Sequence, residues 1–97
     1  MPCQNRLLLV GPARDLKAFD RHDWMKNAGA KHLDLLETSP TRTAWQFETA
    51  ASPLKFLRMT SQHWPSLTFL LDYDCEDHRK GLVKARKGRV RHCWVHY

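Results

Sequence analysis

The sequence has no long hydrophobic run, and this argues against a membrane-spanning helix. Its apolar stretches, such as "LLLV" at residues 7–10, are far shorter than the roughly 18–20 residues that a spanning helix needs. The apolar run near the N-terminus is also shorter than the hydrophobic region of a secretory signal peptide. We therefore expect a cytoplasmic protein that does not associate with membranes.

The chain has only three cysteines, an odd number: Cys3, Cys75 and Cys93. An odd number in a chain without a secretion signal favours free thiols in a reducing compartment over a disulfide framework. We therefore expect these thiols to be free.

Acidic residues are absent from the C-terminal segment. All ten Asp and Glu lie within residues 1–77, together with nine of the sixteen Lys and Arg. Residues 78–97 carry the other seven Lys and Arg and no acid. The net charge of +6 therefore originates in this segment, and such a local field favours anionic partners.

Recognised catalytic motifs are absent as well. The chain has no Gly-rich phosphate loop, no Gly-x-Ser-x-Gly elbow and no His-Glu-x-x-His helix. The turn "CEDH" at residues 75–78 holds a thiol, two acids and an imidazole, but the acids beside Cys75 oppose formation of a thiolate nucleophile. We expect no enzymatic activity and no cofactor.

Hydrophobic periodicity predicts several short elements in one small domain over residues 1–97. Alternating or branched apolar runs predict strands over residues 5–11, 31–38, 42–50 and 66–74, and a hairpin over about 81–97. Helical spacing predicts helices over residues 12–27 and 53–63, the second with Ser52 as its N-terminal cap and ended by Pro65. Gly29 is expected to end the first helix.

The order of these elements indicates the fold class. Strand–helix–strand–strand–helix–strand is typical of a ferredoxin-like βαββαβ sandwich, an α+β fold with two helices on one face of an antiparallel sheet. The C-terminal hairpin over about 81–97 would extend this sheet.

Three segments carry a family resemblance: "FETAASPLKFLRMTSQHWPSLTFLLDYD", "MPCQNRLLLVGPARDLKAF" and "NAGAKHLDL". The first is similar to the Phe-x-Thr-Ala-Trp-Ser-Pro-Pro helix, with the strand after it, of the YubB-type ferredoxin-like family. The second resembles the opening of that family, and the third resembles its Asn-Trp-Gly-Thr-Lys-Trp stretch. Gly81 stands where the family's last strands carry a glycine. The resemblance implies a ferredoxin-like fold and a bacterial, plasmid or phage origin, and it implies no activity.

The chain departs from this family at several positions. Ala28, His32 and Ala51 replace family tryptophans, and Leu54 replaces the second proline. If those tryptophans form a ligand surface in the family, this chain lacks it, and if they pack, a smaller core has replaced them. We favour packing.

The basic segment predicts a hairpin with two different faces. A two-residue turn at Lys87-Gly88 places Arg86 opposite Arg89 and Lys84 opposite Arg91. Directly opposed residues share a face, so these four would form one positive surface. The other face would carry the apolar strip Val83, Ala85, Val90, His92 and Trp94.

This positive surface has two interpretations. Basic side chains on an exposed strand protect a sheet from edge-to-edge aggregation. They also bind anions, and a nucleic acid is the anion that we favour. The expected nucleic-acid-binding residues are Lys84, Arg86, Arg89 and Arg91, supported by Arg79, Lys80 and Lys87. The sequence has no Lys/Arg-Gly-Phe/Tyr-Gly/Ala-Phe-Val run of the kind found in RNA-recognition motifs.

Protein contact is the alternative function. The last strand is expected at the sheet edge, where Trp94 and Tyr97 are aromatics of the kind enriched at interfaces. Such an edge pairs with a second copy or with another protein's strand. The alternative is therefore a homodimer or a protein-interaction module.

A metal site is disfavoured. Cys75, His78, His92, Cys93 and His96 supply ligand types that suit zinc. His92 and Cys93, however, would point to opposite faces of one strand. We therefore expect no metal site.

Overall fold

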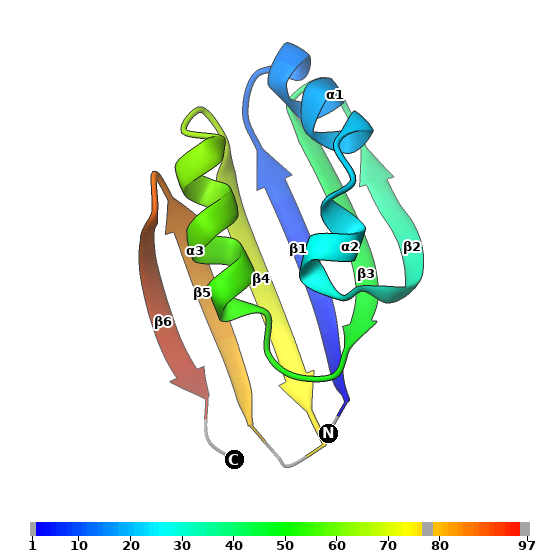
Figure 1. Cartoon of the computed structure of the whole chain (residues 1–97), viewed down its shortest axis with the longest axis vertical. Helices are drawn as coiled ribbons and strands as arrows, with labels where there is room; N and C mark the ends of the chain where they lie inside the picture. The colour runs from blue at the N-terminus through cyan, green and yellow to red at the C-terminus, as the bar shows by residue number, and fades with distance from the viewer. Residues whose placement is uncertain (1, 77–78, 96–97) are drawn as a thin grey trace.

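The computed structural model describes residues 2–76 and 79–95, with the backbone alone for residues 93–95. In chain order its elements are β1 (Cys3–Val10), α1 (Ala13–Arg21), α2 (Trp24–Ala28), β2 (Lys31–Thr38), β3 (Arg42–Thr49), α3 (Leu54–His63), β4 (Thr68–Cys75), β5 (Lys80–Arg86) and β6 (Arg89–Val95). The strands form one sheet in the order β2-β3-β1-β4-β5-β6, and all neighbours are antiparallel (Figure 1). The predicted α+β class is confirmed.

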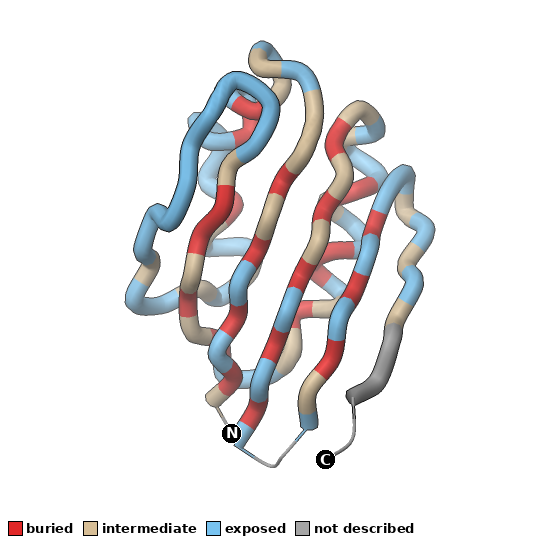
Figure 2. The backbone as a smooth tube through the Cα atoms, turned by 180° about the vertical axis from the view of Figure 1, so that it is seen from behind, coloured by how far each residue is buried: buried red, intermediate tan, exposed pale blue. Residues whose placement is uncertain are grey.

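The helices all lie on one face of the sheet. Figure 1 shows them in front of the strands, and Figure 2, drawn from behind, shows the other face uncovered. Buried and exposed residues alternate along the central strands, as their period of two requires (Figure 2). We call these the covered face and the open face. None of the helices described for residues 2–76 and 79–95 is long and apolar enough to cross a bilayer.

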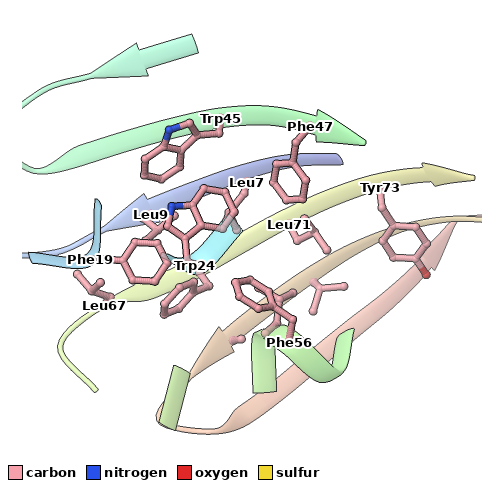
Figure 3. Packing of buried hydrophobic residues seen from close by; sticks show 14 of the residues in the cluster. Leu7, Leu9, Phe19, Trp24, Trp45, Phe47, Phe56, Leu67, Leu71 and Tyr73 are labelled. Carbon is pink, nitrogen blue, oxygen red and sulfur yellow. The ribbon is translucent and has the colours of Figure 1, made fainter. Parts of the chain in front are cut away.

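The alternation that predicts strands over residues 42–50 and 66–74 matches the side chains that the structure buries on β3 and β4. Trp45, Phe47 and Thr49 of β3 are buried against the helices. Phe69, Leu71 and Tyr73 of β4 are buried as well. Figure 3 shows Trp45, Phe47 and Leu71 in one cluster with side chains from the helices.

The single helix predicted over residues 12–27 is wrong, because the chain forms two helices there. His22 has an extended backbone, at φ −76° and ψ 138°, and α2 begins only at Trp24. In one continuous helix Phe19 and Trp24 would point about 140° apart. The break lets both rings enter the core, where they stack with their centroids 5.8 Å apart (Figure 3). Gly29 has the left-handed conformation and ends α2, so the helix end predicted at this glycine is found, but on the second helix.

The start of α3 also differs from the prediction. The capping position is Pro53, and no side chain bonds to the free N–H groups there, so the prediction of Ser52 as the cap is wrong. The end of the helix at His63, ahead of Pro65, is confirmed.

Two of the cysteines form a disulfide, so the prediction of free thiols is wrong for Cys3 and Cys75. These residues are register partners on β1 and β4, with Cα atoms 4.0 Å apart, and both are buried. The count of cysteines does not show which strands are neighbours, so the sequence alone does not predict this pairing. The cysteine argument for a reducing compartment does not hold for this pair.

Candidate nucleic-acid interface

The candidate site is built on the tight turn between β5 and β6. Lys87 and Gly88 form this turn, and both have positive φ angles, of 53° and 79°. Two such residues are the signature of a turn whose twist matches that of the flanking strands. The two-residue turn predicted from the sequence is therefore confirmed.

Helix α3 holds this turn in place. The Gly88 N–H donates to Ser61 Oγ at 3.0 Å, and the Ser61 hydroxyl in turn donates to the Arg58 carbonyl at 3.0 Å. Ser61 is fully buried, so its hydroxyl needs such partners. The hairpin is therefore fixed to the body of the protein at its tip as well as along β4.

The strand register brings five basic residues together at this end of the sheet. Lys84 pairs with Arg91 and Arg86 pairs with Arg89, as the sequence predicts. Lys87 lies in the turn beside them. We call these five the basic cluster: Lys84, Arg86, Lys87, Arg89 and Arg91. All five are exposed, and together they line a hollow of about 480 Å³.

The basic cluster has no acidic partner among the described side chains. Lys26, Arg42 and Lys80 each pair with a carboxylate elsewhere in the chain, whereas no member of the cluster forms an ion pair with any described residue. The residues opposite Lys84 are Leu70 and Arg91, neither of them acidic. Like charges directly opposed destabilise a sheet, so this hairpin retains an electrostatic cost that an anion would relieve.

Two predicted supporting residues lie away from the cluster. Arg79 precedes β5 and Lys80 begins it, at the end opposite to the turn. Arg86 lies six residues after Lys80 on the same strand, so their Cα atoms are about 20 Å apart. The Lys80 ammonium lies 3.5 Å from the carboxylate of Asp74. The structure therefore unites five of the seven expected basic residues.

The covered side of the hairpin holds it against the core. Val83 and Ala85 are buried, and Val90 packs against them from β6. The Tyr73 hydroxyl and His92 Nε2 are hydrogen-bonded at 2.7 Å, which connects β4 to β6 across β5. This contact passes over Gly81, where an added Cβ would lie 2.7 Å from each of the two rings. Position 81 therefore has no room for a side chain, and glycine is the residue that fits there.

The open face also holds apolar residues that the sequence reasoning missed. Leu8, Leu70 and Leu82 lie on β1, β4 and β5 and form what we call the leucine strip. Together with Arg6, Asp72, Lys84 and Arg91 they line a groove of about 760 Å³ that adjoins the basic cluster. Leu82 has 54% of its surface exposed. A signal was present, because "LLLV" and "FLL" are apolar at successive positions and therefore apolar on both faces of their strands.

The metal-ligand types considered from the sequence do not meet in the described part of the chain. Cys75 forms a disulfide with Cys3, so it has no thiolate to offer a metal. His92 Nε2 is hydrogen-bonded to the Tyr73 hydroxyl. His78 and His96, and the side chain of Cys93, lie outside the described residues. Among the described residues no three metal-ligating side chains cluster.

The two aromatics predicted for an interface also lie outside what is described. Tyr97 is beyond the described residues, and Trp94 is described in its backbone alone, paired with Gly81. Strand β6 itself lies at one edge of the six-stranded sheet, as expected.

Comparison of the chain with models of protein families, with curated proteins and with solved structures finds no match in any of the three.

Proposed function

We propose that this chain is a non-enzymatic binding module that holds the phosphate backbone of a nucleic acid against its basic cluster. In this proposal the sheet and its helices are a ferredoxin-like core of the YubB type, and the C-terminal hairpin is the binding extension. The observation that carries the proposal is the hollow lined by five basic side chains with no described acidic partner.

The physical chemistry of polyanions supports this choice. Phosphates are spaced regularly along a nucleic acid, and cations arranged in a row release the counterions condensed on them. Arg86, Arg89 and Arg91 supply guanidinium groups, which bind phosphate with two parallel hydrogen bonds. The turn anchored to Ser61 keeps these groups near one another before binding. Less ordering is then required when the partner arrives.

The test is the triple variant Arg86→Ala/Arg89→Ala/Arg91→Ala in a gel-shift assay at low salt. We expect this variant to lose most of its retention of nucleic acid and to keep its circular dichroism spectrum. The matched control is Lys17→Ala/Arg21→Ala/Lys55→Ala, which removes the same charge from exposed positions on α1 and α3. Equal retention by the two triple variants would contradict the proposal.

A second candidate function is protein contact through β6. The observation that favours it is the position of β6 at the sheet edge, where no other described strand covers it. Such an edge offers backbone N–H and C=O groups to a strand of another molecule. Light scattering on the purified protein decides this point, because a mass of twice 11.4 kDa would favour pairing between copies.

A further inference from the structure

We propose that the polynucleotide bound here is single-stranded, with its unpaired bases lying on the leucine strip while its phosphates contact the basic cluster. This inference rests on the proposed function and specifies its partner. The juxtaposition that carries it is a groove with an apolar floor, flanked by cations on both sides and continuous with the basic cluster.

The floor and the cations are neighbours in the strand register. On the open face Leu70 lies opposite Leu8 on one side and opposite Lys84 on the other. Leu82 is two residues before Lys84 on the same strand, so it shares that face. Lys84 and Arg91 line both the groove and the basic hollow, which makes the two hollows one continuous surface.

Cations lie on both sides of the floor. Arg6 is on β1, two strands from Lys84 on β5, so about 10 Å of sheet separates their strands. Arg6 is exposed and forms no ion pair with any described residue. A chain of phosphates crossing the groove would therefore meet Arg6, beside its register partner Asp72, at one margin and the pair Lys84 and Arg91 at the other.

A duplex and a single strand differ in what they can offer to this surface. A duplex stacks its bases inside and presents phosphates, so it would leave the half-exposed Leu82 facing water or backbone. A single strand presents phosphates together with unpaired base faces. Only the single strand therefore matches a surface that is apolar in its centre and cationic at its margins.

The side chains also predict the character of the binding. No Phe, Trp or Tyr faces outward among the described residues of β1, β4 and β5, so the bases would meet aliphatic carbon rather than stack on rings. Contacts of this kind are apolar and tolerate any base. We therefore expect little dependence on base sequence.

The experiment compares three labelled probes by fluorescence anisotropy at one low salt concentration. The probes are a short single strand, its duplex, and an abasic single strand of the same length and charge. We expect the single strand to bind about fivefold to tenfold more tightly than the abasic strand, since contacts to bases supply part of the affinity. The duplex should bind through its phosphates alone, so its affinity should not depend on the leucine strip.

The variant Leu82→Thr tests the strip itself. Threonine suits a strand, so the fold should be retained. We expect the affinity for the ordinary single strand to fall about threefold to fivefold, because threonine buries less apolar surface than leucine. The affinity for the abasic strand should not change. The matched control is Leu35→Thr on β2, because Leu35 is exposed to a similar extent, 58%, at the far edge of the sheet. This control should bind all three probes like the unmodified chain.

The outcomes separate the two proposals. If none of the three probes binds, both the proposed function and this inference are wrong. If all three bind equally and Leu82→Thr changes nothing, the partner is a polyanion read through phosphates alone, and only this inference is overturned. If the free protein is a dimer that Leu82→Thr separates into monomers, the strip is a contact between copies, and this also overturns the inference.

Discussion

Strand β5 contributes to both faces of the sheet, and the two faces differ in chemistry. Val83 and Ala85 face the helices and are buried, whereas Lys84 and Arg86 face the other way and are exposed. The covered face carries the packed aromatic rings (Figure 3), and the open face carries charges and the leucine strip. A change on the covered face should therefore lower stability, and a change on the open face should alter binding.

The largest effect on stability is expected from removing the disulfide on the covered face. The double variant Cys3→Ala/Cys75→Ala removes a link between residues 72 positions apart in sequence. We expect the free energy of unfolding to fall by about 2–4 kcal/mol, because the unfolded chain gains freedom when the link is lost. Urea unfolding measures this change, and affinity for nucleic acid under native conditions should stay the same.

The thiol content of the unmodified chain provides the control. With the disulfide formed, the denatured and unreduced protein should show one reactive thiol among its three cysteines. Three reactive thiols, together with unchanged stability of the double variant, would contradict this account of Cys3 and Cys75.

A smaller loss of stability is expected at Gly81. In Gly81→Ala the new methyl group would collide with the rings of Tyr73 and His92, whose hydrogen bond passes over this position. Forcing such an insertion costs about 1–3 kcal/mol. Thermal unfolding followed by circular dichroism measures this loss of stability.

Lys84→Ala on the opposite face of the same strand is the matched variant for Gly81→Ala. We expect Lys84→Ala to weaken nucleic-acid binding with little change in the melting temperature, and Gly81→Ala to do the reverse. If both variants changed the same property, the division between the two faces would not hold.

The smallest effect is expected to be a gain in stability. Arg89→Glu replaces a pair of like charges, Arg86 opposite Arg89, with a pair of opposite charges. Cross-strand pairs of this kind contribute roughly 0.2–1 kcal/mol, so the melting temperature should rise by a few degrees. Binding of nucleic acid should weaken at the same time, because a carboxylate now lies in the hollow.

Arg89→Gln serves as the control for this prediction. Glutamine removes the repulsion without introducing an acid, so it should give a smaller gain in stability and a smaller loss of binding. A fall in melting temperature for Arg89→Glu would show that the basic cluster is not under electrostatic strain in the free protein.

Most of the sheet could be predicted because its patterns are local. The alternation along residues 42–50 and 66–74 identifies which side chains face inward, and the Lys87-Gly88 turn leaves one register for the hairpin. This register was enough to place Lys84 beside Arg91 and Arg86 beside Arg89. The part of the site that depends on neighbouring residues in one hairpin was therefore predicted.

The features that were missed depend on contacts between distant segments. The break at His22 serves the packing of Phe19 and Trp24 against the sheet, and periodicity along one helix does not report it. The pairing of Cys3 with Cys75 follows from β1 lying beside β4. The leucine strip likewise assembles from three strands, and the order of these strands is known only in the folded protein.

The salt dependence of nucleic-acid binding shows most clearly whether the basic cluster binds phosphates. For a single strand the logarithm of the affinity falls with the logarithm of salt concentration, with a slope of about −0.7 for each phosphate neutralised. Full engagement of the five cations predicts a slope near −3.5, and the triple variant Arg86→Ala/Arg89→Ala/Arg91→Ala should reduce its magnitude by about 2. A slope near zero, or equal slopes for the two proteins, would contradict the account.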